Sequence, residues 1–234
     1  MGPPVGGAAV LNAGSATPEP SGTLARVADQ GELFDDTVRG SVHLDLPDAD
    51  VTYWPAYFGP DDRTRLLEEL LGTTAWRQDS ITMYGKPVPI PRLQAWYGDP
   101  GRTYTYSNIE MAPQPWTAAL LEVKSAIEPA AGVTFNSVLC NRYRHGGDGV
   151  AWHSDDEPEL GVDPVIGSVS FGATRPFRFR HRHDPDLTHE LDLAPGSLLV
   201  MRGSTQACWK HQIAKTTKPV GERVNLTFRV IVDP

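Results

Sequence analysis

The sequence predicts an α+β fold, with helices in the first half and a sheet-rich half from Thr134 onward. Two segments before residue 133 carry apolar residues along one side, as amphipathic helices do. From Thr134 the pattern changes to short alternating runs separated by turns, which is typical of strands. Because helices come early and strands late, α+β describes the chain better than alternating α/β. A chain of 234 residues with 40% hydrophobic residues is long enough for one well-packed domain.

Residues 1–40 are predicted to form a flexible tail. Gly, Pro, Ala, Ser and Thr account for 18 of the first 25 positions, so this segment has little to bury. Order is expected to start between Leu33 and Val42, and residues 41–234 are expected to form a single domain without a second linker or an internal repeat.

Two helices are expected early in this domain. Pro60-Asp61-Asp62 is typical of a helix N-terminus and Gly72 of a helix end, and a second helix follows Pro115 and ends near Gly132. The apolar residues that indicate these helices are Leu66, Leu67, Leu70 and Leu71, on one side of the first, and Trp116, Leu120, Leu121, Val123 and Ile127 in the second. The segment between them, residues 80–108, is rich in proline and aromatic residues and is expected to form hairpins and loops.

The second half contains eight candidate strands. Eight short strands that close on one another indicate a double-sheet jelly roll (a double-stranded β-helix) or a barrel over about residues 134–232. The candidates span residues 135–143, 150–153, 165–171, 177–182, 191–193, 197–201, 211–213 and 223–231.

Composition narrows the functional classes. No apolar run approaches the roughly 20 residues that a membrane span needs, and no basic segment followed by an apolar core opens the chain, so a protein of the cytoplasm (of the nucleus in a eukaryote) is expected. A monomer is the default expectation for its oligomeric state. Two cysteines, Cys140 and Cys208, are too few for a disulfide framework. Of the net charge of −8, −6 falls in residues 1–60, so the acidity does not exclude a local basic face that binds nucleic acid.

The last candidate strand separates two kinds of side chain. A period of two places Arg223, Asn225, Thr227 and Arg229 on one face, and Val224, Leu226, Phe228 and Val230 on the other. The apolar face is expected to pack into a core. The polar face is either the solvated face of an ordinary strand or the lumen of a barrel, in which two arginines bind the carboxylates of a dianionic small molecule.

A metal site is indicated by three residues in order. His153 and Asp155 lie two residues apart and share a face of an extended strand, and His211 follows 56 residues after Asp155. Two histidines and one carboxylate form the facial triad of non-haem Fe(II) oxygenases, and the absence of clustered thiols disfavours a structural zinc site. Alone, a His-x-Asp triplet is more often a chance occurrence. The Arg-x-Asn-x-Thr-x-Arg strand that follows His211 favours the metal site.

With these motifs in order, residues from about 51 to 232 resemble the AlkB family of Fe(II)/2-oxoglutarate-dependent nucleic-acid dealkylases. The resemblance is strongest to the eukaryotic-type members that act on double-stranded DNA. It is carried by Asn141-Arg-Tyr-Arg, His153-Ser-Asp-Asp-Glu157, Ser168-Val-Ser-Phe-Gly-Ala, Phe179-Arg-His-Arg182, Gly196-Ser-Leu-Leu and Arg223-Val-Asn-Leu-Thr-Phe-Arg229.

The resemblance implies a cofactor set and a reaction. Iron ligation is implied for His153, Asp155 and His211, with dioxygen as a further cosubstrate. The residues implied to contact 2-oxoglutarate are Asn141, Tyr143, Arg223, Thr227 and Arg229, with Asn225 on the same face. The implied enzyme is a dioxygenase that oxidatively dealkylates bases such as 1-methyladenine and 3-methylcytosine in DNA. The reaction is coupled to decarboxylation of 2-oxoglutarate to succinate and releases an aldehyde.

Dealkylation requires a base to leave the stack, so a nucleotide-recognition lid is expected over about residues 80–108. Similarity to the family suggests that Tyr104 and Tyr106 border the flipped base and that Arg92 shapes the nucleotide-binding surface. Tyr84 matches a finger inserted into the duplex, although a plain hairpin turn explains Met83-Tyr84-Gly85 equally well. Asp156 and Glu157 are expected to accept hydrogen bonds from an exocyclic amine and to favour a cationic base.

Three alternating arginines, Arg178, Arg180 and Arg182, are expected to follow phosphates or to form an ordinary solvated face. Two other functions stay open. One is the same oxygenase chemistry on RNA, a protein or a small molecule. The other is a catalytically silent nucleic-acid-binding module, which would need neither the triad nor the arginine pair.

Overall fold

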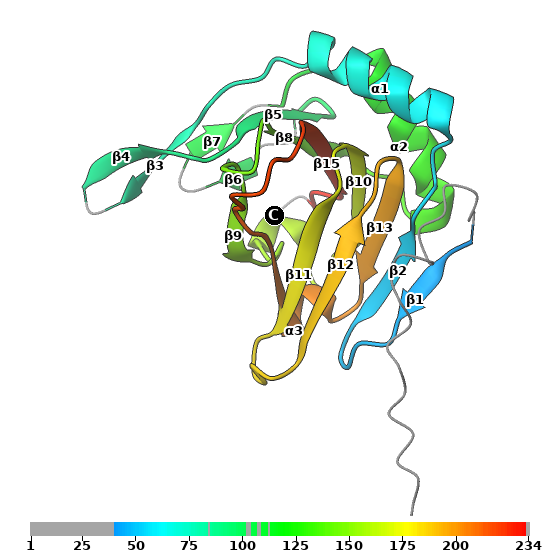
Figure 1. The fold of residues 1–234 in the computed structure, drawn as a ribbon, viewed down its shortest axis with the longest axis vertical. Helices are drawn as coiled ribbons and strands as arrows, with labels where there is room; N and C mark the ends of the chain where they lie inside the picture. Colours follow the sequence, from blue (N-terminus) through cyan, green and yellow to red (C-terminus); the bar gives the residue numbers. More distant parts are fainter. Residues whose placement is uncertain (1–39, 84, 102–103, 107–108, 112, 233–234) are drawn as a thin grey trace, which may run out of the picture.

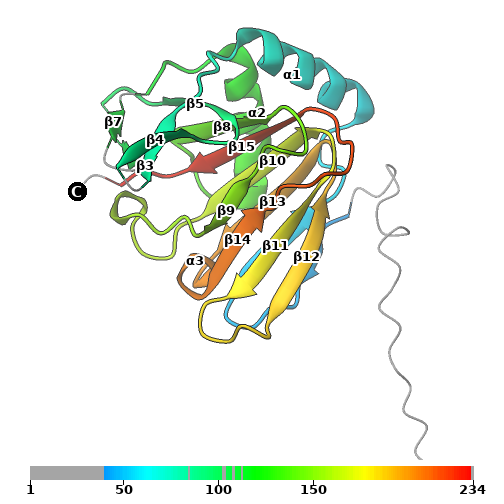
Figure 2. The ribbon, with the colours of Figure 1, turned by 60° about the vertical axis from the view of Figure 1, so that its left-hand side comes forward.

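The computed structural model describes residues 40–83, 85–101, 104–106, 109–111 and 113–232. The predicted tail, apart from Gly40, lies outside the described residues. Two antiparallel sheets and two long helices form the body of the molecule (Figures 1 and 2). No helix in the described part of the chain is long and apolar enough to cross a membrane.

The larger sheet has seven strands in the order β1-β2-β13-β10-β15-β8-β5. Its strands are β1 (Val42–Leu44), β2 (Asp50–Trp54), β5 (Leu93–Gly98), β8 (Ser137–Tyr143), β10 (Ile166–Gly172), β13 (Ser197–Arg202) and β15 (Arg223–Arg229). The smaller sheet, in the order β12-β11-β14-β9, consists of β9 (Val150–His153), β11 (Arg175–His181), β12 (Thr188–Leu193) and β14 (Trp209–Ile213). The smaller sheet faces the larger one in Figure 2.

The larger sheet is buried on both faces. One face packs against α1 (Pro60–Thr73) and α2 (Ala118–Ala131), where Leu66, Val123 and Phe228 share an apolar core. The other face packs against the smaller sheet, where Leu199, Phe177 and Trp209 belong to a second core. All seven residues of β15 are therefore buried, its apolar side chains toward the helices and its polar ones between the sheets.

The predicted helices are present, with one corrected boundary. Thr117 caps α2 by accepting a hydrogen bond from Leu120 N, and Gly132 ends it at φ 73°, a left-handed conformation that suits glycine. Gly72 does not end α1, contrary to prediction. The chain leaves that helix at Thr74 in an extended conformation, which requires no glycine.

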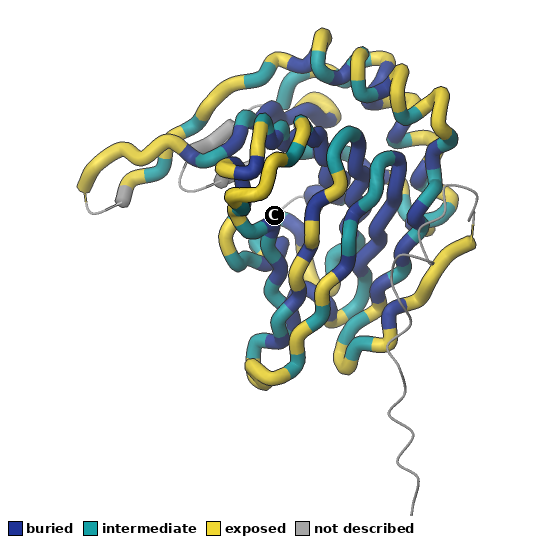
Figure 3. The backbone as a smooth tube through the Cα atoms, in the orientation of Figure 1, coloured by how far each residue is buried: buried dark blue, intermediate teal, exposed yellow. Residues whose placement is uncertain are grey.

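All eight predicted strands are present, with boundaries shifted by up to three residues. The sequence did not predict β1 and β2, which extend one edge of the larger sheet. The segment expected to form only hairpins and loops contains the hairpin β3 (Ser80–Met83)–β4 (Lys86–Pro89), which projects exposed from the body (Figure 3), and the start of the pair β6 (Tyr104–Tyr106)–β7 (Ile109–Met111). It also contributes β5, which pairs with β8 in the larger sheet.

Replacing Thr117 with alanine is expected to lower the free energy of unfolding by about 1 kcal/mol, because the first turn of α2 loses its cap. Urea denaturation of the full chain measures this change. Thr64→Ala is the matched control, since the Thr64 hydroxyl donates only to Pro60 O on the exposed side of α1. Equal losses for the two variants would contradict the capping role of Thr117.

Candidate metal and cosubstrate site

A pocket between the two sheets collects all the predicted metal and cosubstrate residues. β8 and β15 of the larger sheet form one wall, and β9, β11 and β14 of the smaller sheet form the other. The lining residues are Arg92, Leu139, Asn141, Tyr143, Val150, His153, Asp155, Glu157, Ser168, Phe177, Met201, His211, Ile213, Arg223, Asn225, Thr227 and Arg229. The polar face of β15 is thus the lining of a lumen rather than a solvated face.

His153, Asp155 and His211 converge, with ligand atoms that all lie within 4.8 Å of one another. His153 and His211 are paired across β9 and β14, and their ring centroids are 4.3 Å apart. The sequence had suggested that Asp155 lies on an extended strand with His153. In the structure Asp155 instead lies two residues beyond the end of β9. Its backbone N–H donates to Gln206 Oε1 (2.9 Å), which fixes the loop that carries the carboxylate.

The two histidines are held as metal ligands require. Nδ1 of His153 lies 2.8 Å from Ala151 O. Because a carbonyl only accepts, Nδ1 carries the proton and Nε2 keeps its lone pair. The His211 ring stacks on Phe177 with centroids 5.0 Å apart, which fixes its plane.

The electrostatics favour a neutral imidazole beside an ionised carboxylate. Burial, aided by His153 and Arg229, lowers the pKa of His211 to about 3, with Asp155 opposing. Burial works against ionisation of Asp155, but Arg229 and the two histidines outweigh it and hold its pKa at about 2. Near neutral pH His211 therefore offers a nitrogen lone pair and Asp155 a carboxylate, and together with the imidazole of His153 they form a donor set that suits a divalent iron ion.

Two arginines of β15 mark different parts of the pocket. Arg229 Nη2 donates to Asp155 Oδ1 (2.6 Å), so it lies beside the triad. Arg223, six residues earlier, is 1% exposed and donates from Nη2 to Ser170 Oγ (2.9 Å). Its Nε and Nη1 are buried and have no hydrogen-bond partner among the described residues. These two N–H groups of a buried guanidinium can donate hydrogen bonds to the two oxygens of a carboxylate. The pocket therefore fits 2-oxoglutarate, which has two carboxylates.

The remaining predicted cosubstrate residues lie around this pair. Asn225 donates to Ser168 Oγ and Val169 O (both 2.9 Å), and Thr227 donates to Asn225 Oδ1 (3.1 Å). Asn141 Oδ1 accepts from Arg92 Nε (2.9 Å). Arg92, predicted to contact substrate, is therefore buried in the pocket wall beside a cosubstrate residue.

The predicted substrate residues divide into two groups. Glu157 lines the pocket, and its Oε2 is buried without a hydrogen-bond partner in the described chain. Asp156 does not line it, because its side chain turns outward and pairs with Arg182. Tyr84 and the side chains of Tyr104 and Tyr106 lie outside the described residues, although β6 contains both of the latter positions.

The outer arginines are engaged with neighbouring side chains. Arg178 pairs with Glu190 (2.5 Å), Arg182 pairs with Asp156, and the Arg180 guanidinium lies 4.6 Å from the centroid of Trp152. Phosphates approaching this strand would therefore compete with these contacts.

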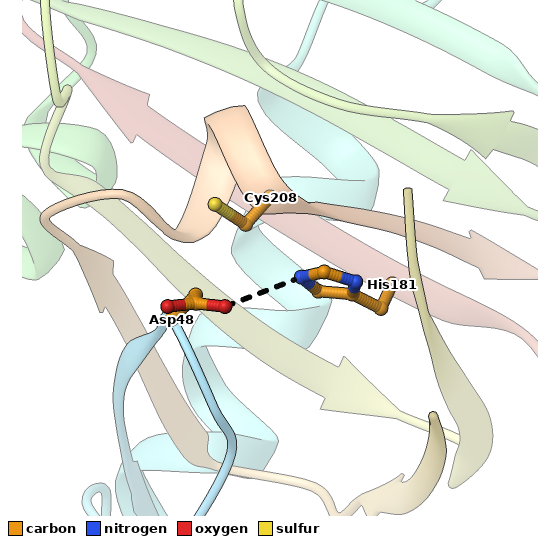
Figure 4. A group of neighbouring side chains, drawn as sticks. All are labelled: Asp48, His181 and Cys208. Atoms are coloured by element: carbon orange, nitrogen blue, oxygen red, sulfur yellow. Dashed lines mark ion pairs between the residues drawn. The ribbon is translucent and has the colours of Figure 1, made fainter. Parts of the chain in front are cut away.

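A second group of possible ligands, Asp48, His181 and Cys208, lies at the end of β11 (Figure 4). His181 Nε2 is 3.6 Å from Asp48 Oδ2. However, Nδ1 of His181 accepts from the backbone N–H of Asp184 (3.1 Å), so the ring proton is on Nε2. The nitrogen that faces the group offers no lone pair to a metal, in contrast to His153.

Sequence reasoning missed two residues that shape the site, Gln206 and Phe177. Gln206 lies on α3 (Thr205–Cys208), a four-residue helix with no periodic pattern, and its contact to Asp155 spans 51 positions. Phe177 was expected only as a strand residue. Its stacking on His211 follows from the pairing of β11 with β14.

Comparison with known proteins agrees with this geometry. Residues 50–229 match the family model of the 2OG-Fe(II) oxygenase superfamily. A solved structure of OsALKBH1 matches 82% of this chain and 100% of that chain with a TM-score of 0.60 at 15% identity, which supports the fold.

The similar proteins include two kinds of AlkB homologue. Alpha-ketoglutarate-dependent dioxygenase alkB homolog 3 of Rattus norvegicus is 44% identical over 77% of this chain, which spans 64% of that protein. DNA oxidative demethylase ALKBH2 of Homo sapiens is 37% identical over 81% of this chain, which spans 76% of that protein. The chain therefore belongs to the 2OG-Fe(II) oxygenase superfamily, within the AlkB family.

Proposed function

We propose that this chain is a Fe(II)/2-oxoglutarate-dependent dioxygenase that removes alkyl groups from N-alkylated bases in DNA, such as 1-methyladenine and 3-methylcytosine. The names of its relatives, a dioxygenase and a DNA oxidative demethylase, support the reaction class and the substrate class. The single observation that carries the proposal is the pocket, which is lined both by the His-Asp-His group and by Arg223, a buried arginine with two nitrogens that have no hydrogen-bond partner in the described chain.

In this proposal His153, Asp155 and His211 hold Fe(II), and Arg223, with Asn141, Tyr143, Asn225, Thr227 and Arg229, holds 2-oxoglutarate. Together, iron, 2-oxoglutarate and dioxygen supply the oxidation of the N-alkyl carbon, after which the base is released with an aldehyde, succinate and CO2. The protein orients these groups: Gln206 fixes the Asp155 loop, and Phe177 fixes the His211 ring. Between the sheets Asp155 and His211 are only 3% and 4% exposed, which limits their contact with bulk water.

Glu157 supports a cationic base as the substrate. Its buried Oε2 has no partner in the described part of the protein and lies in the same pocket as the triad. Such an oxygen stabilises a positive charge and accepts a hydrogen bond from an exocyclic amine. Near neutral pH, 1-methyladenine and 3-methylcytosine carry both a positive charge and an exocyclic amine.

Glu157→Gln is therefore expected to lower kcat/KM for 1-methyladenine roughly thirtyfold. This corresponds to a loss of about 2 kcal/mol of transition-state stabilisation, because a charge-assisted hydrogen bond is lost. The assay measures methyl loss from an oligonucleotide, single-stranded and in a duplex, by mass spectrometry. Turnover of 3-methylthymine, which is neutral and lacks an exocyclic amine, should change little in the same variant.

Asp156→Asn is the matched control, since it neutralises the adjacent carboxylate, which pairs with Arg182 outside the pocket. It should leave the preference for 1-methyladenine over 3-methylthymine unchanged. If Glu157→Gln slowed both bases equally, Glu157 would not read the charge of the base.

A further inference from the structure

Arg175, the first residue of β11, is a buried cation that none of the steps above uses. Its side chain is 1% exposed. One nitrogen, Nη2, donates to Asp148 O (3.1 Å) and Ala214 O (2.7 Å). The other two, Nε and Nη1, are buried with no hydrogen-bond partner within the described ranges.

Arg175 lies beside the arginine assigned to the cosubstrate. The guanidinium carbon of Arg175 is 5.9 Å from the centroid of the Tyr143 ring, and that of Arg223 is 5.1 Å from the same centroid. Tyr143 lines the pocket and Arg175 does not, so Arg175 lies outside the lumen but close to a ring that borders it.

No described carboxylate balances these two charges by an ion pair of its own. Asp148, the carboxylate whose charge acts on Arg175, is held by Arg144 through hydrogen bonds of 2.8 and 3.0 Å. Burial lowers the pKa of both arginines, and Arg175 contributes to the lowering at Arg223. Burying two like charges side by side is costly unless an anion joins them.

The backbone builds this juxtaposition. Gly172 ends β10 at φ 83°, and a Cβ there would lie 2.3 Å from Glu222 O, immediately before Arg223. Ala173 N donates to the same carbonyl (2.8 Å). The tight turn between β10 and β11 therefore holds Arg175 against the start of β15.

We propose that Arg175 is a positioning residue for the cosubstrate, which raises the affinity of the Arg223 end of the pocket for a carboxylate by adding a second positive charge beside Tyr143. The proposal rests on the assignment of 2-oxoglutarate to this pocket under the proposed function. The expected ligand is a dianion whose carboxylate farther from the metal contacts Arg223, while Arg175 acts through its field and through the Tyr143 ring.

The test is calorimetric titration of 2-oxoglutarate into the full chain loaded with Mn(II), without nucleic acid. Arg175→Met should raise Kd by about tenfold, as expected for the loss of one charge about 12 Å from a carboxylate at an effective dielectric constant near 20. Arg175→Lys should recover most of the affinity. Lys215→Met is the control, because Lys215 borders an outer hollow that Arg175 also borders, and it should leave Kd unchanged.

A second readout separates this role from simple packing. The rise in Tm that a fixed 2-oxoglutarate concentration produces, measured against each variant's own ligand-free Tm, should shrink in Arg175→Met. A packing role would lower the ligand-free Tm and leave that rise intact. An unchanged Kd in Arg175→Met overturns the inference alone, whereas failure of the unaltered protein to bind 2-oxoglutarate overturns the proposed function with it.

Discussion

His211→Ala is expected to abolish metal binding and to reduce turnover by about a thousandfold or more, because only two of the three ligands remain. His211 is 4% exposed and stacked on Phe177, so neither solvent nor a flexible neighbour readily takes its place. The measurement is the ratio of Fe(II) to protein after anaerobic loading, followed by single-turnover succinate release.

The matched control is His181→Ala, which removes a similarly buried histidine from the same sheet. Because Nε2 of His181 carries a proton toward Asp48, this variant should still bind one metal per chain and should keep its activity. Full loading of His211→Ala would contradict the triad. A second metal per chain, lost in His181→Ala, would contradict the tautomer assigned to His181.

Arg223→Met is expected to weaken 2-oxoglutarate binding by about 3 kcal/mol, or roughly a hundredfold in Kd, because a fully buried charge partner of the carboxylate is removed. The ligand-free protein should lose little stability, since two nitrogens of this guanidinium have no partner in the described chain and its burial is unfavourable without an anion. Calorimetry and urea denaturation measure the two effects.

The opposite effect on stability is expected at Arg229, whose buried guanidinium forms an ion pair with Asp155. Arg229→Met should lower the free energy of unfolding by about 3 kcal/mol, since it strands the Asp155 carboxylate. If Arg223→Met destabilised the ligand-free protein as much as this variant and bound 2-oxoglutarate normally, Arg223 would be structural.

The features that could be predicted from the sequence are those that a local pattern of residues determines, such as the faces of a strand and the ends of a helix. Alternation over seven residues of β15 separated its two faces correctly and placed the apolar one in a core, but it left open whether the polar face was solvated or lined the pocket, as it does. The cap at Thr117 and the left-handed Gly132 bound α2 near the residues expected. The strands β1 and β2 precede the helices, outside the sheet-rich half in which strands were expected, and β2 joins the larger sheet by pairing with the distant β13.

The candidate site was predictable as a set of residues but not as a set of contacts. Residue order named the members of the triad, yet the pairing of Asp155 with Arg229 spans 74 positions and depends on how the two sheets meet. The same holds for Asp156 and Glu157, which are adjacent in sequence. Asp156 pairs with Arg182 outside the pocket, whereas Glu157 lines the pocket. The turn after β9 sets this difference.

The central claim is that this pocket oxidises alkylated DNA with 2-oxoglutarate. The most direct measurement loads the full chain with Fe(II) anaerobically, admits oxygen with 2-oxoglutarate and DNA containing 1-methyladenine, and follows the methyl group and succinate by mass spectrometry. The expected result is methyl loss that requires 2-oxoglutarate and disappears in His153→Ala. Succinate without methyl loss would contradict the DNA substrate and favour RNA, a protein or a small molecule, and neither product with iron bound would contradict the dioxygenase itself.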